Sequence, residues 1–165
     1  PHGGVPAGPP HRRHPVAAAA RALLGLRGFR RIQHGGHRLG VVDVVERELW
    51  TPLGLRSLAP GEPGYCARYE GDPDQRDAVY HQGIAWPWLL GPFVEAWLRV
   101  RGGSIAAKRE ARARFVAPVL EHLGQAGLGH VSEIADAESP FTPRGCPFQA
   151  WSLGELLRLE CEVLA

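Results

Sequence analysis

The sequence contains no methionine, a single lysine, three cysteines and no long apolar run, and each shortage excludes a class of protein or site. No apolar stretch approaches the roughly 20 residues that cross a bilayer, and no compact apolar segment near the N-terminus ends at a cleavage site. Neither a membrane-spanning protein nor a secreted precursor is predicted. The cysteines (Cys66, Cys146 and Cys161) are odd in number and form no CxxC pair, which argues against a disulfide framework or a zinc site. Reduced thiols in a cytoplasmic protein fit this pattern best.

The remaining composition is typical of a globular domain. Of the 165 residues, 44% are hydrophobic and 22% are charged, with a net charge of +2. Because the chain begins with Pro1 and has no methionine, we expect it to be a piece of a longer polypeptide.

Acidic residues are missing from the first 38 positions, which hold seven arginines. Residues 39–165 carry more acidic than basic residues, so the net positive charge of the chain comes from its N-terminal 38 residues. Lys108 is the only lysine among 19 basic residues, and the sequence is also rich in Ala, Gly and Pro. This bias indicates GC-rich coding rather than phosphate binding, and we do not expect nucleic acid as a partner.

Residues 1–15 hold five prolines, three glycines and three histidines, so they lack an apolar face to bury. An Ala/Leu/Arg stretch over 16–31 predicts a helix that Gly25 and Gly28 interrupt. Beyond residue 40 the apolar spacing predicts a series of helices, with a kink near Pro118. These helices are expected over 41–49, 84–100, 104–123 and 147–164. Long loops over 54–77 and 130–147 separate them, and no segment alternates as a strand does, so the fold is predicted to be all-α.

The densest group of chemically useful residues spans 69–88, where acids, an amide, an imidazole and aromatic rings meet before a helix. A pyranose ring packs its C–H faces on aromatic rings and pairs its hydroxyls with planar polar groups, so this mixture suits a sugar. The same residues have a plainer interpretation. Trp86 and Trp88 would belong to the core, and the acids would be solvated or would cap a helix, as Asp77 could.

A second group spans 132–151 and contains Glu133 between the apolar residues Val131 and Ile134. Most loop glutamates are solvated. This one precedes an arginine and a Gln-Trp helix start, a setting in which a carboxylate could be held against a substrate.

These residues resemble the glycogen debranching enzyme family, in its C-terminal amylo-α-1,6-glucosidase domain. The resemblance rests on blocks that occur in matching order over about three quarters of the chain. They are ERELWTPLGLRSL at 46–58, YEGD at 69–72 with RD at 76–77, YHQG at 80–83, WPWLLGPF at 86–93, SEI at 132–134, TPRGC at 142–146 and QAWS at 149–152.

The resemblance implies part of an (α/α)6 toroid, the six-hairpin glycosidase fold, which hydrolyses the α-1,6-linked glucose stub of glycogen or a branched α-glucan with inversion. Glu133 stands where the family has its catalytic base, and no cofactor or metal is implied. The family also implies a set of substrate-binding and loop-holding residues. These are Tyr80, His81, Gln82, Trp86 and Trp88 around the glucose, and Tyr69, Asp72, Arg76, Asp77 and Arg144 on hydroxyls or loops.

Two departures from the family pattern limit the expected activity. The family's general acid is an upstream aspartate, yet no carboxylate precedes Asp43 here. Residues 41–165 also have room for only four or five helices, whereas twelve would need roughly 200 residues or more. We therefore expect 1–40 to be an unmatched, largely disordered leader and 41–165 to be the C-terminal part of a catalytic domain, inactive alone.

Three hypotheses about the function follow from the sequence. The first is an enzyme fragment that needs the missing N-terminal half of its catalytic domain as a partner. The second is a non-catalytic piece that binds carbohydrate or complements another polypeptide. The third is a related (α/α)6 hydrolase that acts on trehalose or an α-1,4-glucan, which the TPLGLRSL and TPRGC blocks disfavour.

Overall fold

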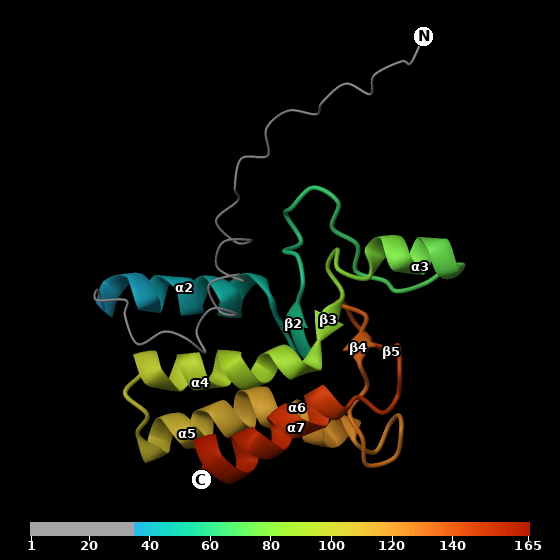
Figure 1. Ribbon diagram of the computed structural model, residues 1–165. Helices are drawn as coiled ribbons and strands as arrows, with labels where there is room; N and C mark the ends of the chain where they lie inside the picture. Colours follow the sequence, from blue (N-terminus) through green and yellow to red (C-terminus); the bar gives the residue numbers. More distant parts are fainter. Residues whose placement is uncertain (1–34) are drawn as a thin grey trace.

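The computed structural model describes residues 35–165, and helices make up about half of them (Figure 1). The expected leader up to residue 34, including the helix predicted over 16–31, lies outside the described residues. The α-helices are α2 (Gly35–Glu48), α3 (Pro73–Val79), α4 (Leu90–Val100), α5 (Ile105–Ala111), α6 (Ala117–His122) and α7 (Ala150–Arg158). Three shorter helical segments are η2 (Pro87–Leu89), of 3-10 type, and the π-helical η3 (Arg112–Val116) and η4 (Leu159–Val163).

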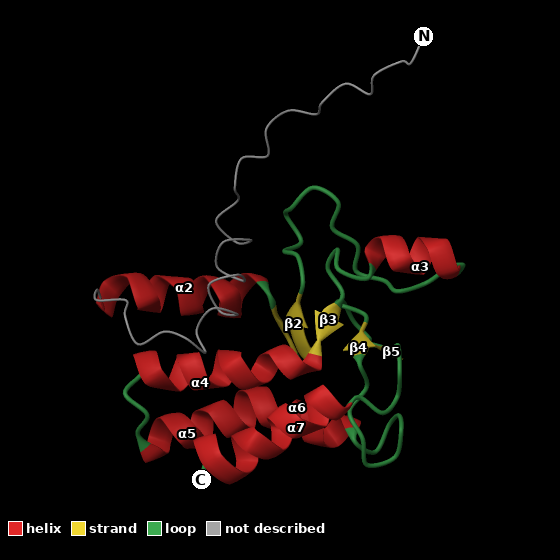
Figure 2. Cartoon of the chain, in the orientation of Figure 1, coloured by secondary structure: helices red, strands yellow, loops and turns green. Residues whose placement is uncertain are grey.

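A small antiparallel sheet accompanies the helices, so the all-α prediction is wrong in this respect (Figure 2). Its strands follow the order β1-β2-β3-β4-β5. They are β1 (Trp50–Thr51), β2 (Gly54–Arg56), β3 (Ala85–Trp86), β4 (Ile134–Ala135) and β5 (Pro143–Arg144). Leu55 of β2 pairs with Trp86 of β3, and Ala85 pairs with Ala135 of β4. Strands of two or three residues are too short for an alternating pattern to be recognised in the sequence.

The predicted helix over 84–100 begins later than expected, at Pro87. Residues 85–86 form β3 instead, and Trp86 is the extended N-cap of η2, which continues into α4. Proline has no N–H to donate, so it is tolerated in the first turn of a helix. The same proline therefore marks where the strand ends and the helix starts.

The predicted helix after Ser104 is confirmed. The Ser104 hydroxyl accepts a hydrogen bond from the Ala107 N–H at 3.2 Å, which caps α5. The helical path then continues through η3 into α6. Its π-helical turn ends two residues before Pro118, whose missing N–H cannot complete the regular bonding pattern.

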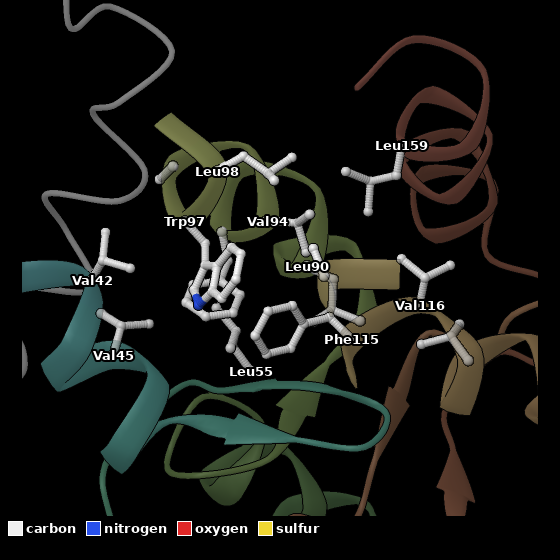
Figure 3. Packing of buried hydrophobic residues seen from close by; sticks show 14 of the residues in the cluster. Val42, Val45, Leu55, Leu90, Val94, Trp97, Leu98, Phe115, Val116 and Leu159 are labelled. Carbon is white, nitrogen blue, oxygen red and sulfur yellow. The ribbon is translucent and has the colours of Figure 1, made fainter. Parts of the chain in front are cut away.

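The core forms around α4, which lies between α2 and the layer of α5, α6 and α7 (Figure 1). Phe115 of η3 meets two aromatic rings of α4 edge-on, Phe93 at 5.1 Å and Trp97 at 5.4 Å between ring centroids. Figure 3 shows Trp97 between Val45 of α2 and Phe115. These side chains are at most 1% exposed, and Trp97, Phe93 and Phe115 are the largest fully buried ones among the described residues, so their burial favours folding strongly.

The segment predicted as a loop over 54–77 is partly regular. Its start forms β2, and its end enters α3, a helix with no buried residue. The predicted loop over 130–147 likewise carries β4 and β5, and the last helix begins at Ala150 rather than Pro147. Within the described residues, no helix is both long and apolar enough to cross a membrane.

Candidate active site

A cavity of about 570 Å³ opens where the sheet meets the start of α7. This volume lies within the ~300–1,000 Å³ range of small-molecule sites. Five of its lining residues are among those predicted to form the site, namely Tyr80, His81, Trp86, Trp88 and Glu133. The others are Leu49, Leu55, Arg56, Ser57, Leu89, Pro92, Gln149 and Trp151.

Glu133 lies just before β4, and hydrogen bonds hold both oxygens of its carboxylate. The Tyr80 hydroxyl donates to Oε1, and the Cys146 N–H donates to Oε2 at 3.0 Å. The Glu133 N–H in turn donates to the Cys146 carbonyl at 2.8 Å. Of the cavity-lining residues that the structure describes, Glu133 is the only carboxylate.

Gly145 makes this arrangement of Glu133 possible. Its φ of +68° is a left-handed conformation that glycine adopts readily. A Cβ atom at this position would lie 2.5 Å from Oε2 of Glu133 and 2.9 Å from Cγ1 of Ile134. Only glycine therefore lets the backbone pass so close to the carboxylate.

Aromatic rings surround the Tyr80 end of the cavity. The His81 ring stacks on Trp86 with centroids 5.1 Å apart and an interplanar angle of 12°, and Tyr80 meets Trp86 edge-on at 4.8 Å. Burial and the hydrogen bond to Glu133 raise the pKa of the Tyr80 hydroxyl above its ordinary value. Tyr80 therefore stays protonated, and so remains a donor to Glu133, throughout the neutral range.

Two buried nitrogens of the residues that line the cavity have no protein partner among the described residues. The buried Trp86 Nε1 and Arg56 Nε are both unpaired donors. Ser57 accepts a hydrogen bond from the Gly83 N–H at 3.0 Å through its hydroxyl oxygen. An unpaired buried donor costs stability, and both nitrogens are buried beneath the cavity surface, so they do not reach a ligand.

Two tryptophans lie at the α7 end of the cavity. Trp88 and Trp151 meet edge-on, with ring centroids 6.1 Å apart and an interplanar angle of 74°. Trp151 is 68% exposed, whereas Trp86 is 8% exposed. The aromatic wall of the cavity, formed by Trp86, Trp88 and Trp151, therefore runs from a buried end at Trp86 to an open rim at Trp151.

Gln82 is the one residue expected around the sugar that does not line the cavity. It is exposed, and its backbone carbonyl accepts a hydrogen bond from the Cys66 N–H at 2.6 Å. This contact joins the loop after β2 to the segment before β3.

Four other predicted residues lie around α3, away from the cavity lining. The Asp72 side chain accepts from the Gln75 N–H at 2.9 Å and caps α3. The Arg76 guanidinium lies 5.9 Å from the centroid of the Tyr69 ring. Asp77 is exposed, and its carbonyl accepts from the Tyr80 N–H at 3.3 Å.

Arg144 also lies outside the cavity lining and pairs with the fully buried Asp136. Its Nε and Nη2 donate to Oδ2 of Asp136 at 3.1 and 2.9 Å, and this pairing raises the pKa of the guanidinium. The other carboxylate oxygen accepts the Tyr69 N–H at 2.9 Å, and Arg68 lies 3.4 Å from Oδ2. Asp136 therefore ties the segment before α3 to β5.

Four polar or aromatic residues of the cavity are absent from the predicted set: Arg56, Ser57, Gln149 and Trp151. Arg56 and Ser57 reach the site through β2, which the sequence pattern does not reveal. Gln149 and Trp151 closely follow Cys146, whose backbone contacts Glu133. The three cysteines all lie in the described part of the chain and are free thiols, and residues 35–165 contain no cluster of side chains suited to a metal ion.

Comparisons with known proteins give a family match, and the curated relatives include a glycogen debranching enzyme. Residues 31–158 match the family model described as amylo-alpha-1,6-glucosidase. A glycogen debranching enzyme from Saccharomyces cerevisiae (strain ATCC 204508 / S288c) is 25% identical over 141 residues, which cover 74% of this chain and 9% of the yeast protein. The chain therefore spans only a small part of the length of that relative.

Proposed function

The chain belongs to the amylo-alpha-1,6-glucosidase family, and from that premise we propose that it supplies the catalytic base and part of the glucose pocket for hydrolysis of α-1,6-linked glucose stubs. The substrate would be glycogen or a related branched α-glucan. Glu133 carries the proposal, because it is a carboxylate with two donors on a cavity rich in aromatic rings.

In the proposed reaction Glu133 removes a proton from water as that water attacks the anomeric carbon of the stub. Glucose leaves with the opposite anomeric configuration, while a protonated acid across the sugar gives its proton to the leaving oxygen. The hydrogen bonds from Tyr80 and Cys146 orient the carboxylate and still leave lone pairs for the water.

The general acid would come from a segment other than residues 35–165. An inverting pair of carboxyl groups stands roughly 6.5–9.5 Å apart across the site. The described cavity lining offers no second carboxylate to Glu133, and no acidic residue precedes Asp43 in the sequence. We propose that another part of the catalytic domain supplies the acid and that residues 41–165 belong to an (α/α)6 toroid completed there. The free thiols support a reducing, cytoplasmic setting.

The presence of a single carboxylate also favours a second candidate function. A chain that binds a glucan without hydrolysing it would need the aromatic wall but no acid. The two candidates differ in whether Glu133 is required for turnover or only lies near the bound sugar.

A chimera separates these candidates. Residues 31–158 would replace the matching segment of the yeast glycogen debranching enzyme, and glucose release would be measured with 6-O-α-glucosyl-maltotriose. We expect the chimera to release β-glucose and Glu133→Gln to lower the rate by about a thousandfold while oligosaccharide binding persists. The matched control is Asp74→Asn, an exposed carboxylate of α3 outside the cavity.

Retained turnover in the Glu133→Gln chimera would disprove the assignment of the base. If the unsubstituted chimera is folded and binds the oligosaccharide but releases no glucose, the non-catalytic candidate is supported. The chain alone is expected to bind the oligosaccharide weakly and to release none.

A further inference from the structure

The structure points to a second sugar site at the open rim of the cavity, and we propose that Trp151 and Gln149 bind the main-chain glucosyl unit to which the stub is attached. This inference rests on the proposed function, because it extends the same cavity from the stub to the glucan that carries it. Neither residue was predicted to bind substrate.

The exposure of the tryptophans places this second site at the rim. Trp86 is 8% exposed, Trp88 is partly buried, and Trp151 is 68% exposed, yet all three line one cavity. A terminal glucose can enter the buried end. A main chain that continues in both directions needs open space on two sides, which favours the exposed rim.

The Trp151 indole is suited to a sugar ring. It meets Trp88 in a T-shaped contact at 74°, and such a contact can cover at most one face of the Trp151 indole. Tryptophan is largely buried in most proteins, whereas Trp151 is exposed and also lines the cavity, so its indole is accessible to a ligand there. The C–H face of a pyranose matches such a flat apolar surface.

Gln149 adds a polar group next to this surface. It is the N-cap of α7, but its side chain makes no capping hydrogen bond, and its backbone N–H donates to the Val131 carbonyl at 3.0 Å. In the described part of the chain the side-chain amide has no partner. An amide offers donors and an acceptor together, which is what neighbouring sugar hydroxyls require.

Calorimetric titration of this chain with two ligands tests the proposal. Glucose occupies only the stub pocket, whereas 6-O-α-glucosyl-maltotriose also reaches the rim. We expect Trp151→Ala to weaken binding of the branched tetrasaccharide by about five- to tenfold and to leave glucose binding unchanged. Trp151→Tyr should restore most of the difference. Leu157→Ala is the matched control, because Leu157 is also exposed on α7 but lies outside the cavity lining.

Each outcome is decisive. Equal losses for both ligands in Trp151→Ala, or an unchanged affinity for the tetrasaccharide, would overturn the rim site while leaving the glucan-binding function intact. If the folded wild-type chain binds neither ligand, the rim site is overturned, whereas the proposed function is judged separately by glucose release from the chimera.

Discussion

Tyr80 and Glu133 are 53 residues apart in the sequence, and the hydroxyl of the tyrosine donates a hydrogen bond to the carboxylate of the glutamate. The bond joins the segment after α3 to the entrance of β4. It therefore links the two sequence regions that were expected to hold the sugar and the base.

This bond predicts a pH-dependent contribution to stability. The folded state raises the pKa of Tyr80 above its ordinary value of 10.0. Below pH 10 both states keep the proton and the contribution is complete, whereas above pH 10 the unfolded state loses its proton first and stability falls. We expect Tyr80→Phe to lower the free energy of unfolding by about 1–2 kcal/mol at neutral pH. Urea unfolding should show that the difference in free energy of unfolding between wild type and Tyr80→Phe decreases as the pH rises above 10.

Tyr69→Phe is the control for that measurement, since the Tyr69 ring contacts Tyr80 but its hydroxyl makes no hydrogen bond within the described residues. A gap between wild type and Tyr80→Phe that stays constant across pH 10 would contradict the assigned role of the Tyr80 hydroxyl.

Gly145→Ala should disturb the position of Glu133. The new Cβ would lie 2.5 Å from the Glu133 carboxylate in addition to the cost of a positive φ. Gly102→Ala is a matched control, because Gly102 has a φ of +78° and open space around its Cβ position. Gly102→Ala should cost about 1–2 kcal/mol through backbone strain alone. Gly145→Ala should cost more and also weaken glucose binding, and equal thermal shifts with unchanged binding would refute the steric argument.

Asp136→Asn should be among the most destabilising polar substitutions in the chain. Asp136 is fully buried and faces Arg144, Arg68 and the Tyr69 N–H, so its removal leaves two guanidinium groups without their buried carboxylate. We expect a loss of about 3 kcal/mol in urea unfolding. Glu70→Gln removes only the exposed partner of Arg144 and should cost less than about 1 kcal/mol. Similar losses in the free energy of unfolding for both variants would show that the cost of removing the carboxylate charge does not depend on the burial of Asp136.

The longer helices could be predicted from the sequence because their apolar spacing persists over several turns. Ser104 and Pro87 indicate two of the helix starts through their own chemistry. The strands could not be predicted, because each spans only two or three residues and is fixed by pairing with distant segments, as Ala85 is with Ala135.

The residues of the cavity could likewise be predicted only where the local sequence reveals them. Tyr80, His81, Trp86, Trp88 and Glu133 lie in two motif-rich stretches, and the fold brings them together. Arg56 reaches the cavity because β2 pairs with β3, and this pairing is not visible in local sequence. Asp72 was expected to serve the substrate or a loop, but its observed contacts are those of a helix cap, a role that the sequence chemistry allows equally.

Glu46→Gln should loosen the attachment of α2 to the core. Glu46 accepts the Trp97 Nε1–H at 2.8 Å, lies 3.3 Å from Arg101 and pairs with Arg114, so one carboxylate joins α2 to α4 and η3. A glutamine keeps an acceptor for Trp97 but removes the charge that faces two arginines, and we expect a loss of about 1–2 kcal/mol. Asp43→Asn affects only a half-exposed pair with Arg101 and should cost less than about 0.5 kcal/mol. Limited proteolysis should then cut residues 35–48 faster in Glu46→Gln than in Asp43→Asn, because α2 detaches more often; equal cleavage rates would mean that apolar packing alone holds α2 on the core.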